Sequence, residues 1–353
     1  MAPLRVAIIG SGIGAMHAKG YRWLPEKFDL PVLCALDEER SHRVCARHKI
    51  PEFSKDFEAV LARDDIDVID ICTPPDQHYW MCEAALAAGK QVICEKPLFG
   101  SIAEVDAMEA IVAASGRLLM PIFQYRFGAG LQKLKHLIAE DLTGPAFLTA
   151  IETHWWRDAD YYAVPWRGKW ATEFGGGLLG HAIHAHDMLN YVHGPSAEVF
   201  AMTTTLVNPI EVEDTAALSV RLANGSLASL SMTLGSRREA SRLRFAFRDL
   251  VAESQTEPYT MSRDPWTFIA EDEAHQARID AALANWPHHE DSYTRQFELF
   301  HDAVTKGAPL PVTLQDARRS LELVTAAYHS ARTNQPVALP LDSGHPLYRG
   351  WLP

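Results

Sequence analysis

The sequence has no long apolar run. Of its 353 residues 47% are hydrophobic and 22% charged, and no stretch approaches the roughly 20 apolar residues that cross a bilayer. The opening MAPLRVAIIGSG leads directly into an expected strand and glycine turn, without the charged, apolar and cleavable regions of a secretory signal. We therefore expect a globular, cytoplasmic protein that is not a membrane protein.

Cysteine is scarce, and basic residues are outnumbered by acidic ones. The five cysteines all lie in the first third of the chain and form no CxxC pair, so we expect reduced thiols instead of disulfides or a zinc site. The formal net charge is −12 and no Lys/Arg tract occurs. This balance argues against nucleic acid or an anionic membrane as a partner and favours a small molecule.

Two textures divide the chain, which is too long for one ordinary core. In residues 1–122, short runs such as LRVAIIG and PVLCALD alternate with amphipathic segments, which predicts a doubly wound, mostly parallel sheet. In residues 123–353, runs such as TAALSVRLANGSLASLSMTL alternate apolar and polar residues around a hairpin turn at Asn224-Gly225. The predicted fold class is therefore α/β, with a carboxyl-terminal α+β domain that contains a large, mainly antiparallel sheet.

Immediately after the first expected strand stands GSGIGA, which fits the pattern G-x-G-x-x-G/A. Gly10 permits the tight turn, Gly12 lets a pyrophosphate approach the backbone, and Ser11 and Ile13 complete the loop. The helix that follows offers free N–H donors to phosphates. Such a loop can also be a plain turn, but Asp37, about 20 residues further on, completes the fingerprint of a dinucleotide site.

The same acidic residue indicates which dinucleotide binds. Asp37 can accept hydrogen bonds from the ribose hydroxyls and would repel a 2′-phosphate. We therefore predict NAD as the cofactor in preference to NADP, although the nearby Arg40 works against this preference.

The segment IDVIDICTPPDQHYWMCEAALAAGKQVICEKPL places Glu95, Lys96 and Pro97 at the carboxyl end of an expected parallel strand, where ligands bind in such sheets. With the AIIGSGIGAMHAKGY opening, it resembles the glucose-fructose oxidoreductase, inositol dehydrogenase and rhizopine catabolism protein family, usually called Gfo/Idh/MocA. Further motifs are WRGKW, the GGG-to-HAHD stretch and AAYHSARTNQPVALP, so the resemblance extends over essentially the whole chain. It implies an amino-terminal Rossmann domain and an open carboxyl-terminal sheet that often makes subunit contacts, and hence a homodimer or homotetramer.

The resemblance also implies roles for single residues. Lys96 would hydrogen-bond the reacting hydroxyl or carbonyl beside the nicotinamide, next to Glu95, and the Lys96–Pro97 bond is often cis in such enzymes. Arg126 matches a position at the mouth of the substrate cleft. The remaining matches line the ribose and nicotinamide side of the cofactor: Thr73, Pro74 and His78.

The stretch GGGLLGHAIHAHD, residues 175–187, could be a metal site, a piece of core or a catalytic segment. We predict no metal here, because His186 points away from the helix face of His181 and His184 and no HExxH motif or cysteine partner exists. A structural role stays open for His186.

His184 has a more specific match in the same stretch. HAHD resembles the family's H-x-x-D element, whose histidine is the general acid/base, and an imidazole suits proton exchange with an alcohol at neutral pH. Relatives with D-x-G-x-H place an aspartate where this chain has Gly180. His181, Asp187 or His154 would then have to orient His184.

Aromatic residues and arginines concentrate in HWWRDADYYAVPWRGKW. Tryptophan faces stack on sugar rings and arginines bind carboxylate, phosphate or sulfonate, although an interface or core patch would have the same composition. The candidate substrate contacts are His154, Trp156, Arg157, Arg167, His181, His184 and Arg126.

Together these features predict an NAD-dependent oxidoreductase that acts on a secondary hydroxyl, or the corresponding ketone, of a sugar, cyclitol or sugar acid. Lys96 and His184 would flank the reacting oxygen. One alternative is an NAD-dependent glycosidase or lyase that works by transient oxidation. Another is a non-catalytic dinucleotide-sensing regulator, which the retention of Lys96 and His184 disfavours.

Overall fold

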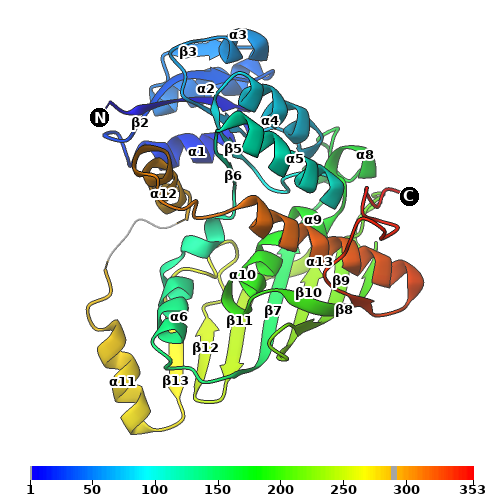
Figure 1. The fold of residues 1–353 in the computed structure, drawn as a ribbon. Helices are drawn as coiled ribbons and strands as arrows, with labels where there is room; N and C mark the ends of the chain where they lie inside the picture. The colour runs from blue at the N-terminus through cyan, green and yellow to red at the C-terminus, as the bar shows by residue number, and fades with distance from the viewer. Residues whose placement is uncertain (1, 288–291) are drawn as a thin grey trace. The chain divides into compact units, whose positions relative to one another are not determined.

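The structure is a computed structural model that describes residues 2–287 and 292–353 (Figure 1). Contacts between residues divide the chain into two units. The first comprises Met1–Ile122 and Tyr293–Ala317, and the second Phe123–Ser292 and Arg318–Pro353. In the part of the chain that is described, no helix combines the length and apolarity needed to cross a bilayer.

The first unit contains a six-stranded, fully parallel sheet in the order β3-β2-β1-β4-β5-β6. This confirms the predicted doubly wound sheet. Its strand order reverses between β1 and β4, the place where such sheets bind ligands at their carboxyl ends. The strands are β1 Leu4–Ile9, β2 Phe28–Cys34, β3 Glu52–Ser54, β4 Val68–Ile71, β5 Gln91–Cys94 and β6 Leu119–Pro121. The helices are α1 Gly14–Tyr21, α2 Glu38–His48, α3 Phe57–Leu61, α4 His78–Ala87, α5 Ile102–Ser115 and α12 Ser292–Lys306, with a 3-10 turn at Pro75–Gln77.

Helix α12 corrects the expected domain division. The boundary after residue 122 agrees with the sequence, but the predicted second domain, 123–353, included this helix, which belongs to the first unit. The physical reason is aromatic packing, because Phe297 stacks on Tyr21 of α1 with ring centroids 4.0 Å apart. Nothing local to α12 indicates this long-range contact.

The second unit contains an eight-stranded sheet in the order β13-β12-β11-β7-β10-β9-β8-β14. Every pair is antiparallel except β7 with β10, which confirms the mainly antiparallel prediction. The strands are β7 Ala146–Trp156, β8 Ser196–Thr204, β9 Thr215–Leu222, β10 Leu227–Thr233, β11 Gly235–Phe247, β12 Leu250–Ser254, β13 Trp266–Ala270 and β14 Val337–Ala338. The helices are α6 Ala129–Ala139, α7 Ala159–Tyr162, α8 Trp170–Glu173, α9 Gly177–Gly180, α10 Ile183–His193, α11 Glu273–Leu283 and α13 Leu314–Thr333, with a 3-10 turn at Gln124–Phe127.

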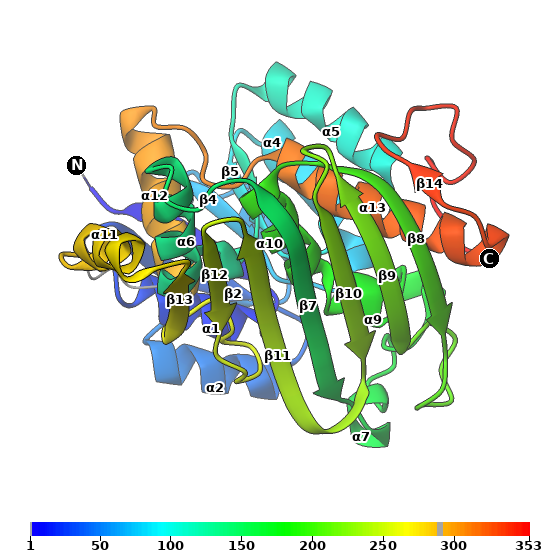
Figure 2. The same ribbon diagram turned by 90° about the horizontal axis from the view of Figure 1, so that it is seen from below.

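Helices α10 and α13 cover one face of this second sheet, and the strands face the viewer in Figure 2. Along β7 the side chains of Thr149, Ile151, Thr153 and Trp155 are buried, and those between them are not, as expected when one face of a sheet forms the core. The open face exposes apolar side chains and has a hollow of about 300 Å³ lined by β7, β8, β9 and β10.

Candidate active site

The loop between β1 and α1 has the geometry of a phosphate cradle. Gly10 has a φ of 111°, and a Cβ there would lie 2.4 Å from the carbonyl oxygen of Cys72, so only glycine fits. A Cβ on Gly12 would meet nothing closer than Arg40 at 4.0 Å, so the backbone is approachable at this point. Ser11 is buried and Ile13 is exposed. These residues fit a dinucleotide pyrophosphate at the amino terminus of α1.

Asp37 follows β2 at the carboxyl edge of the same sheet. It is the N-cap of α2, where its Oδ1 accepts a hydrogen bond of 3.0 Å from the backbone N–H of Arg40. The Arg40 side chain lies 3.5 Å from the other carboxylate oxygen, and both side chains are about half exposed. The carboxylate is therefore available to a ribose while it also fixes the start of the helix.

His78 connects the segments that follow strands β4 and β5. It is buried, its Nδ1 lies 2.9 Å from the carbonyl oxygen of Pro97, and its Nε2 lies 3.0 Å from that of Thr73. Burial lowers the pKa of His78. Both ring nitrogens face backbone carbonyl oxygens, so a contact of His78 with the cofactor stays a prediction that would involve the face or edge of the ring. Thr73 and Pro74, by contrast, are partly exposed.

Glu95 and Lys96 directly follow strand β5, and the Lys96–Pro97 peptide is cis, as the resemblance implies. Lys96 is partly exposed, whereas Glu95 is buried. The Glu95 carboxylate accepts hydrogen bonds from the Lys96 backbone N–H at 2.9 Å and from the Tyr293 hydroxyl at 2.9 Å. Glu95 thus holds the backbone of the lysine, while its role as a cofactor contact stays a prediction.

In the second unit, His184 lies in the first turn of α10 and is 4% exposed. Its ring packs on Tyr125 at 4.3 Å between centroids and meets the edge of Phe123 at 6.2 Å. Both aromatic residues come from the segment that opens this unit. They fix the plane of the imidazole, which a proton-transfer role requires.

Arg126 and Asp187 are both buried, and Asp187 follows His184 by three residues in the sequence. Its Nε donates to Asp187 Oδ2 at 2.7 Å, and a second nitrogen donates to the other carboxylate oxygen. The Arg126 guanidinium also lies over the Tyr191 ring at 4.9 Å. The charge of Arg126 is thus paired inside the unit, and its role as a substrate contact stays a prediction.

The glycines that precede His181 pack against Glu213. This buried carboxylate accepts hydrogen bonds from the backbone N–H groups of Gly176 at 3.0 Å and Leu178 at 2.8 Å. The Tyr328 hydroxyl donates to it at 3.1 Å. Burial raises the pKa of Glu213 to about 7, against the opposing effect of these hydrogen bonds.

His186 has the structural role left open for it. It is buried, its Nδ1 has no hydrogen-bond partner among the described residues, and burial lowers its pKa to about 3. The ring therefore stays neutral and packs beside Leu178 and Leu230 around a cavity of about 10 Å³.

Two predicted arginines meet on one tyrosine. Arg157 and Arg167 place their guanidinium carbons 4.9 and 4.0 Å from the centre of the Tyr161 ring. The Tyr161 hydroxyl lies 3.1 Å from Nε2 of His181, and Trp155 meets the His181 ring at 5.6 Å. The structure thus brings together Arg157, Arg167 and His181.

His154 and Trp156 do not join this group. Side chains of a strand alternate between faces, so these two lie on the opposite face of β7 from Trp155, which contacts His181. His154 hydrogen-bonds Ser231 at 2.9 Å, and Trp156 lies under Arg237 at 3.6 Å. The structure therefore does not bring His154 and Trp156 together with His181, and their roles as substrate contacts stay predictions.

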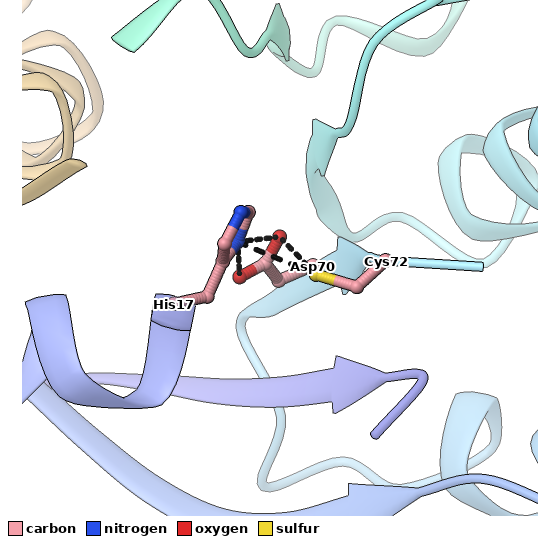
Figure 3. A group of neighbouring side chains, drawn as sticks. All are labelled: His17, Asp70 and Cys72. Carbon is pink, nitrogen blue, oxygen red and sulfur yellow. Dashed lines mark hydrogen bonds and ion pairs between the residues drawn. The ribbon is translucent and has the colours of Figure 1, made fainter. Parts of the chain in front are cut away.

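The sequence interpretation missed a buried group formed by His17, Asp70 and Cys72 (Figure 3). One potential ligand atom of each lies within 4.8 Å of the others, so the set could hold a metal ion. The 2.8 Å between His17 Nδ1 and Asp70 Oδ2, however, is a hydrogen-bond distance. The signal was a lone acidic residue in the apolar run VIDIC.

Comparison with known families identifies the fold. A sequence model described as the NAD-binding Rossmann fold of an oxidoreductase family matches residues 4–123, and its C-terminal alpha/beta domain matches residues 135–339. The chain belongs to the Gfo/Idh/MocA oxidoreductase family. This confirms the family and the fold class that the sequence predicted.

Relatives of this Gfo/Idh/MocA protein match it from end to end. Oxidoreductase YrbE of Bacillus subtilis is 26% identical and covers 94% of this chain and 95% of its own. Myo-inositol 2-dehydrogenase of Thermotoga maritima is also 26% identical, with coverages of 95% and 98%. Among solved structures, the WlbA dehydrogenase of Chromobacterium violaceum, in complex with NADH and UDP-GlcNAcA, is 25% identical with a TM-score of 0.84 and 97% of each chain covered.

Proposed function

We propose that this protein is an NAD-dependent dehydrogenase that oxidises a secondary hydroxyl, or reduces the ketone, of a sugar, cyclitol or sugar acid. The observation that carries the proposal is Lys96, partly exposed at the carboxyl end of β5 in a unit that matches the NAD-binding family model. Carbohydrate chemistry is supported by the relatives, which include a myo-inositol 2-dehydrogenase and a levoglucosan dehydrogenase.

The two proposed catalytic residues would act on one oxygen. The Lys96 ammonium donates a hydrogen bond to the reacting hydroxyl, and His184 accepts its proton as the carbon–hydrogen bond breaks. NAD, when bound, supplies the hydride acceptor. In the reverse direction His184 returns the proton and Lys96 polarises the ketone oxygen.

The preference for NAD over NADP rests on Asp37. Its half-exposed carboxylate stands at the end of β2, where it can accept hydrogen bonds from ribose hydroxyls and repel a 2′-phosphate. Arg40 is paired with Asp37 at 3.5 Å, so its charge is partly committed.

Acidic sugars are favoured within the proposed substrate class. Arg157 and Arg167 share the Tyr161 ring beside His181, three residues before His184. Each has a carboxylate neighbour, Glu239 at 3.2 Å and Glu173 at 3.5 Å, so neither guanidinium forms a tight bidentate pair with it. Arg157 Nε has no hydrogen-bond partner among the described residues, and a substrate carboxylate would accept from it and from Arg167.

The functional test is NAD reduction by matched neutral and acidic sugars: D-glucose, D-glucuronate and myo-inositol. We expect stoichiometric nicotinamide absorbance, with D-glucuronate turned over more efficiently than D-glucose. Lys96→Met should lower turnover at least about 100-fold while NAD binding, measured by fluorescence, is retained. Unchanged turnover in Lys96→Met contradicts the proposal. Cleavage of a glycoside without net NADH would favour transient oxidation.

A further inference from the structure

The imidazole of His17 bridges two carboxylates in the interior of the first unit. Its Nδ1 lies 2.8 Å from Oδ2 of Asp70 in β4, and its Nε2 lies 3.0 Å from Oε1 of Glu95 at the end of β5. Figure 3 shows the Asp70 side of this bridge, where Cys72 also contacts Nδ1 at 3.3 Å. The ring and both carboxylates are buried. A single side chain of helix α1 thus connects strand β4 with the residue that follows strand β5, at the carboxyl ends of the parallel strands.

The two carboxylate neighbours favour the charged form of this ring. A carboxylate accepts hydrogen bonds, so the imidazolium form of His17, with a proton on each ring nitrogen, is the form that donates to both neighbours. Burial by itself would lower the pKa of His17, but the Asp70 charge raises it well above the ordinary value. Burial would likewise raise the pKa of Glu95, but the hydrogen bond and charge of His17 hold it at about 2. The three groups therefore form a buried ion triad.

Buried ion pairs of this kind contribute little net stability, because the cost of desolvation offsets the attraction between the charges. Stability alone therefore does not account for the triad. Its position suggests a different role, because Glu95 is the residue immediately before Lys96.

Glu95 connects His17 with the backbone of Lys96. Its Oε2 accepts the Lys96 backbone N–H at 2.9 Å, while its Oε1 is held by His17 and by the Tyr293 hydroxyl. On the other side of Lys96 in the sequence, Nδ1 of His78 lies 2.9 Å from the carbonyl oxygen of Pro97. The backbone around the lysine is thus fixed from both sides by buried histidines.

We propose that His17 is a positioning residue, which holds Glu95 so that the Lys96 ammonium meets the reacting oxygen. The inference rests on the proposed function, in which Lys96 is catalytic. His17 is too deeply buried to touch a substrate and acts only through the Glu95 carboxylate. Small displacements of a catalytic group lower the rate far more than they weaken binding.

The test is His17→Gln, because an amide can donate to only one of the two carboxylates. We expect kcat to fall about 100-fold, with the dissociation constant for NADH, measured by fluorescence, unchanged within about twofold. The deuterium isotope effect on kcat, measured with a C-deuterated form of the best sugar substrate, should rise as hydride transfer becomes rate-limiting. His48→Gln, at another buried histidine of this unit, is the matched control with wild-type kinetics.

A double variant separates positioning from general damage. In the Lys96→Met background, His17→Gln should cause no further loss of the residual activity, because the lysine it positions is gone. A further loss of the full 100-fold, or an unchanged kcat and isotope effect in folded His17→Gln, overturns the proposal. If His17→Gln does not fold, Tyr293→Phe decides by the same measurements, with a smaller expected loss. Failure of the proposed function looks different, because Lys96→Met would then turn over normally.

Discussion

The backbone carbonyl oxygen of Glu213 lies so close to Gly176 that a Cβ at Gly176 would come within 1.8 Å of it. The same glutamate binds the glycine segment through its side chain, at the backbone N–H groups of Gly176 and Leu178. The hydroxyl of Tyr328 would likewise be 2.3 Å from a Cβ at Gly175. Glycine is therefore required at positions 175 and 176, because Tyr328 and Glu213 lie too close for a side chain. The contacts of this segment with Glu213 also hold the chain that leads into α10 and His184.

Gly176→Ala should be far more damaging than Gly180→Ala. At Gly176 the new methyl group collides with backbone that cannot move aside, and we expect a loss of about 3 kcal/mol or more in the free energy of unfolding. At Gly180 a Cβ would meet nothing within 4 Å, so the matched variant should stay within about 1 kcal/mol of wild type. Urea unfolding followed by circular dichroism measures both, and equal losses would contradict the argument.

Glu213 should make stability fall as the pH rises toward neutrality. Its pKa is about 7 in the folded protein and near 4.5 in the unfolded chain, so between these values only the folded state keeps the proton. The favourable contribution, roughly 3 kcal/mol at most, is complete below pH 4.5 and is lost as the pH passes through 7. Glu213→Gln should remove this slope between pH 5 and 7. Glu152→Gln, on the open sheet face, should leave it in place.

Local sequence patterns were enough to predict the parallel sheet of the first unit and its glycine turn. The parallel sheet and the turn at Gly10 follow from runs and spacings within about 35 residues of each other, where steric rules act directly. Contacts between distant segments could not be predicted in this way. Arg126 donates to Asp187, which is 61 residues away in the sequence, and Tyr293 donates to Glu95, which is 198 residues away. The tertiary fold alone creates these pairs.

The sequence itself already separates some residues of the aromatic segment. The run AFLTAIETHWW was predicted as a strand, and alternation within a strand already separates His154 and Trp156 from Trp155. Composition had grouped all the aromatic residues of this segment into one surface. The strand period, applied residue by residue, assigns only Trp155 to the face of His181.

The Arg126–Asp187 pair should behave as a structural ion pair. Asp187→Asn leaves a buried guanidinium without its counter-charge and should cost about 3–5 kcal/mol in the free energy of unfolding. The double variant Arg126→Met/Asp187→Leu removes both charges and should be more stable than either single variant. Chemical denaturation decides the point. Additive losses in the double variant would show that the two residues act independently.

Asp37→Asn should shift cofactor preference toward NADP. The amide oxygen can still cap α2 at the Arg40 N–H, so the helix is retained while the negative charge is removed. Loss of that charge also leaves the Arg40 side chain available to a 2′-phosphate. We expect the NADP-to-NAD ratio of kcat/KM to rise about tenfold or more, as one surface charge interaction of 1–2 kcal/mol implies. Arg40→Gln in the same background should reverse part of the gain.

The open face of the second sheet should mediate the self-association of this chain into the homodimer or homotetramer that the family resemblance implies. Leu148, Met202 and Ile269 are 48%, 61% and 60% exposed on its strands, an unusual concentration of apolar surface for a monomer. A charge placed in such a surface is buried at cost in an oligomer but not in a monomer. Met202→Glu should therefore lower the mass measured by size-exclusion chromatography with light scattering. Leu36→Glu, at an 85% exposed leucine of the first unit, should leave the mass unchanged. A monomeric wild-type protein would refute this role for the sheet.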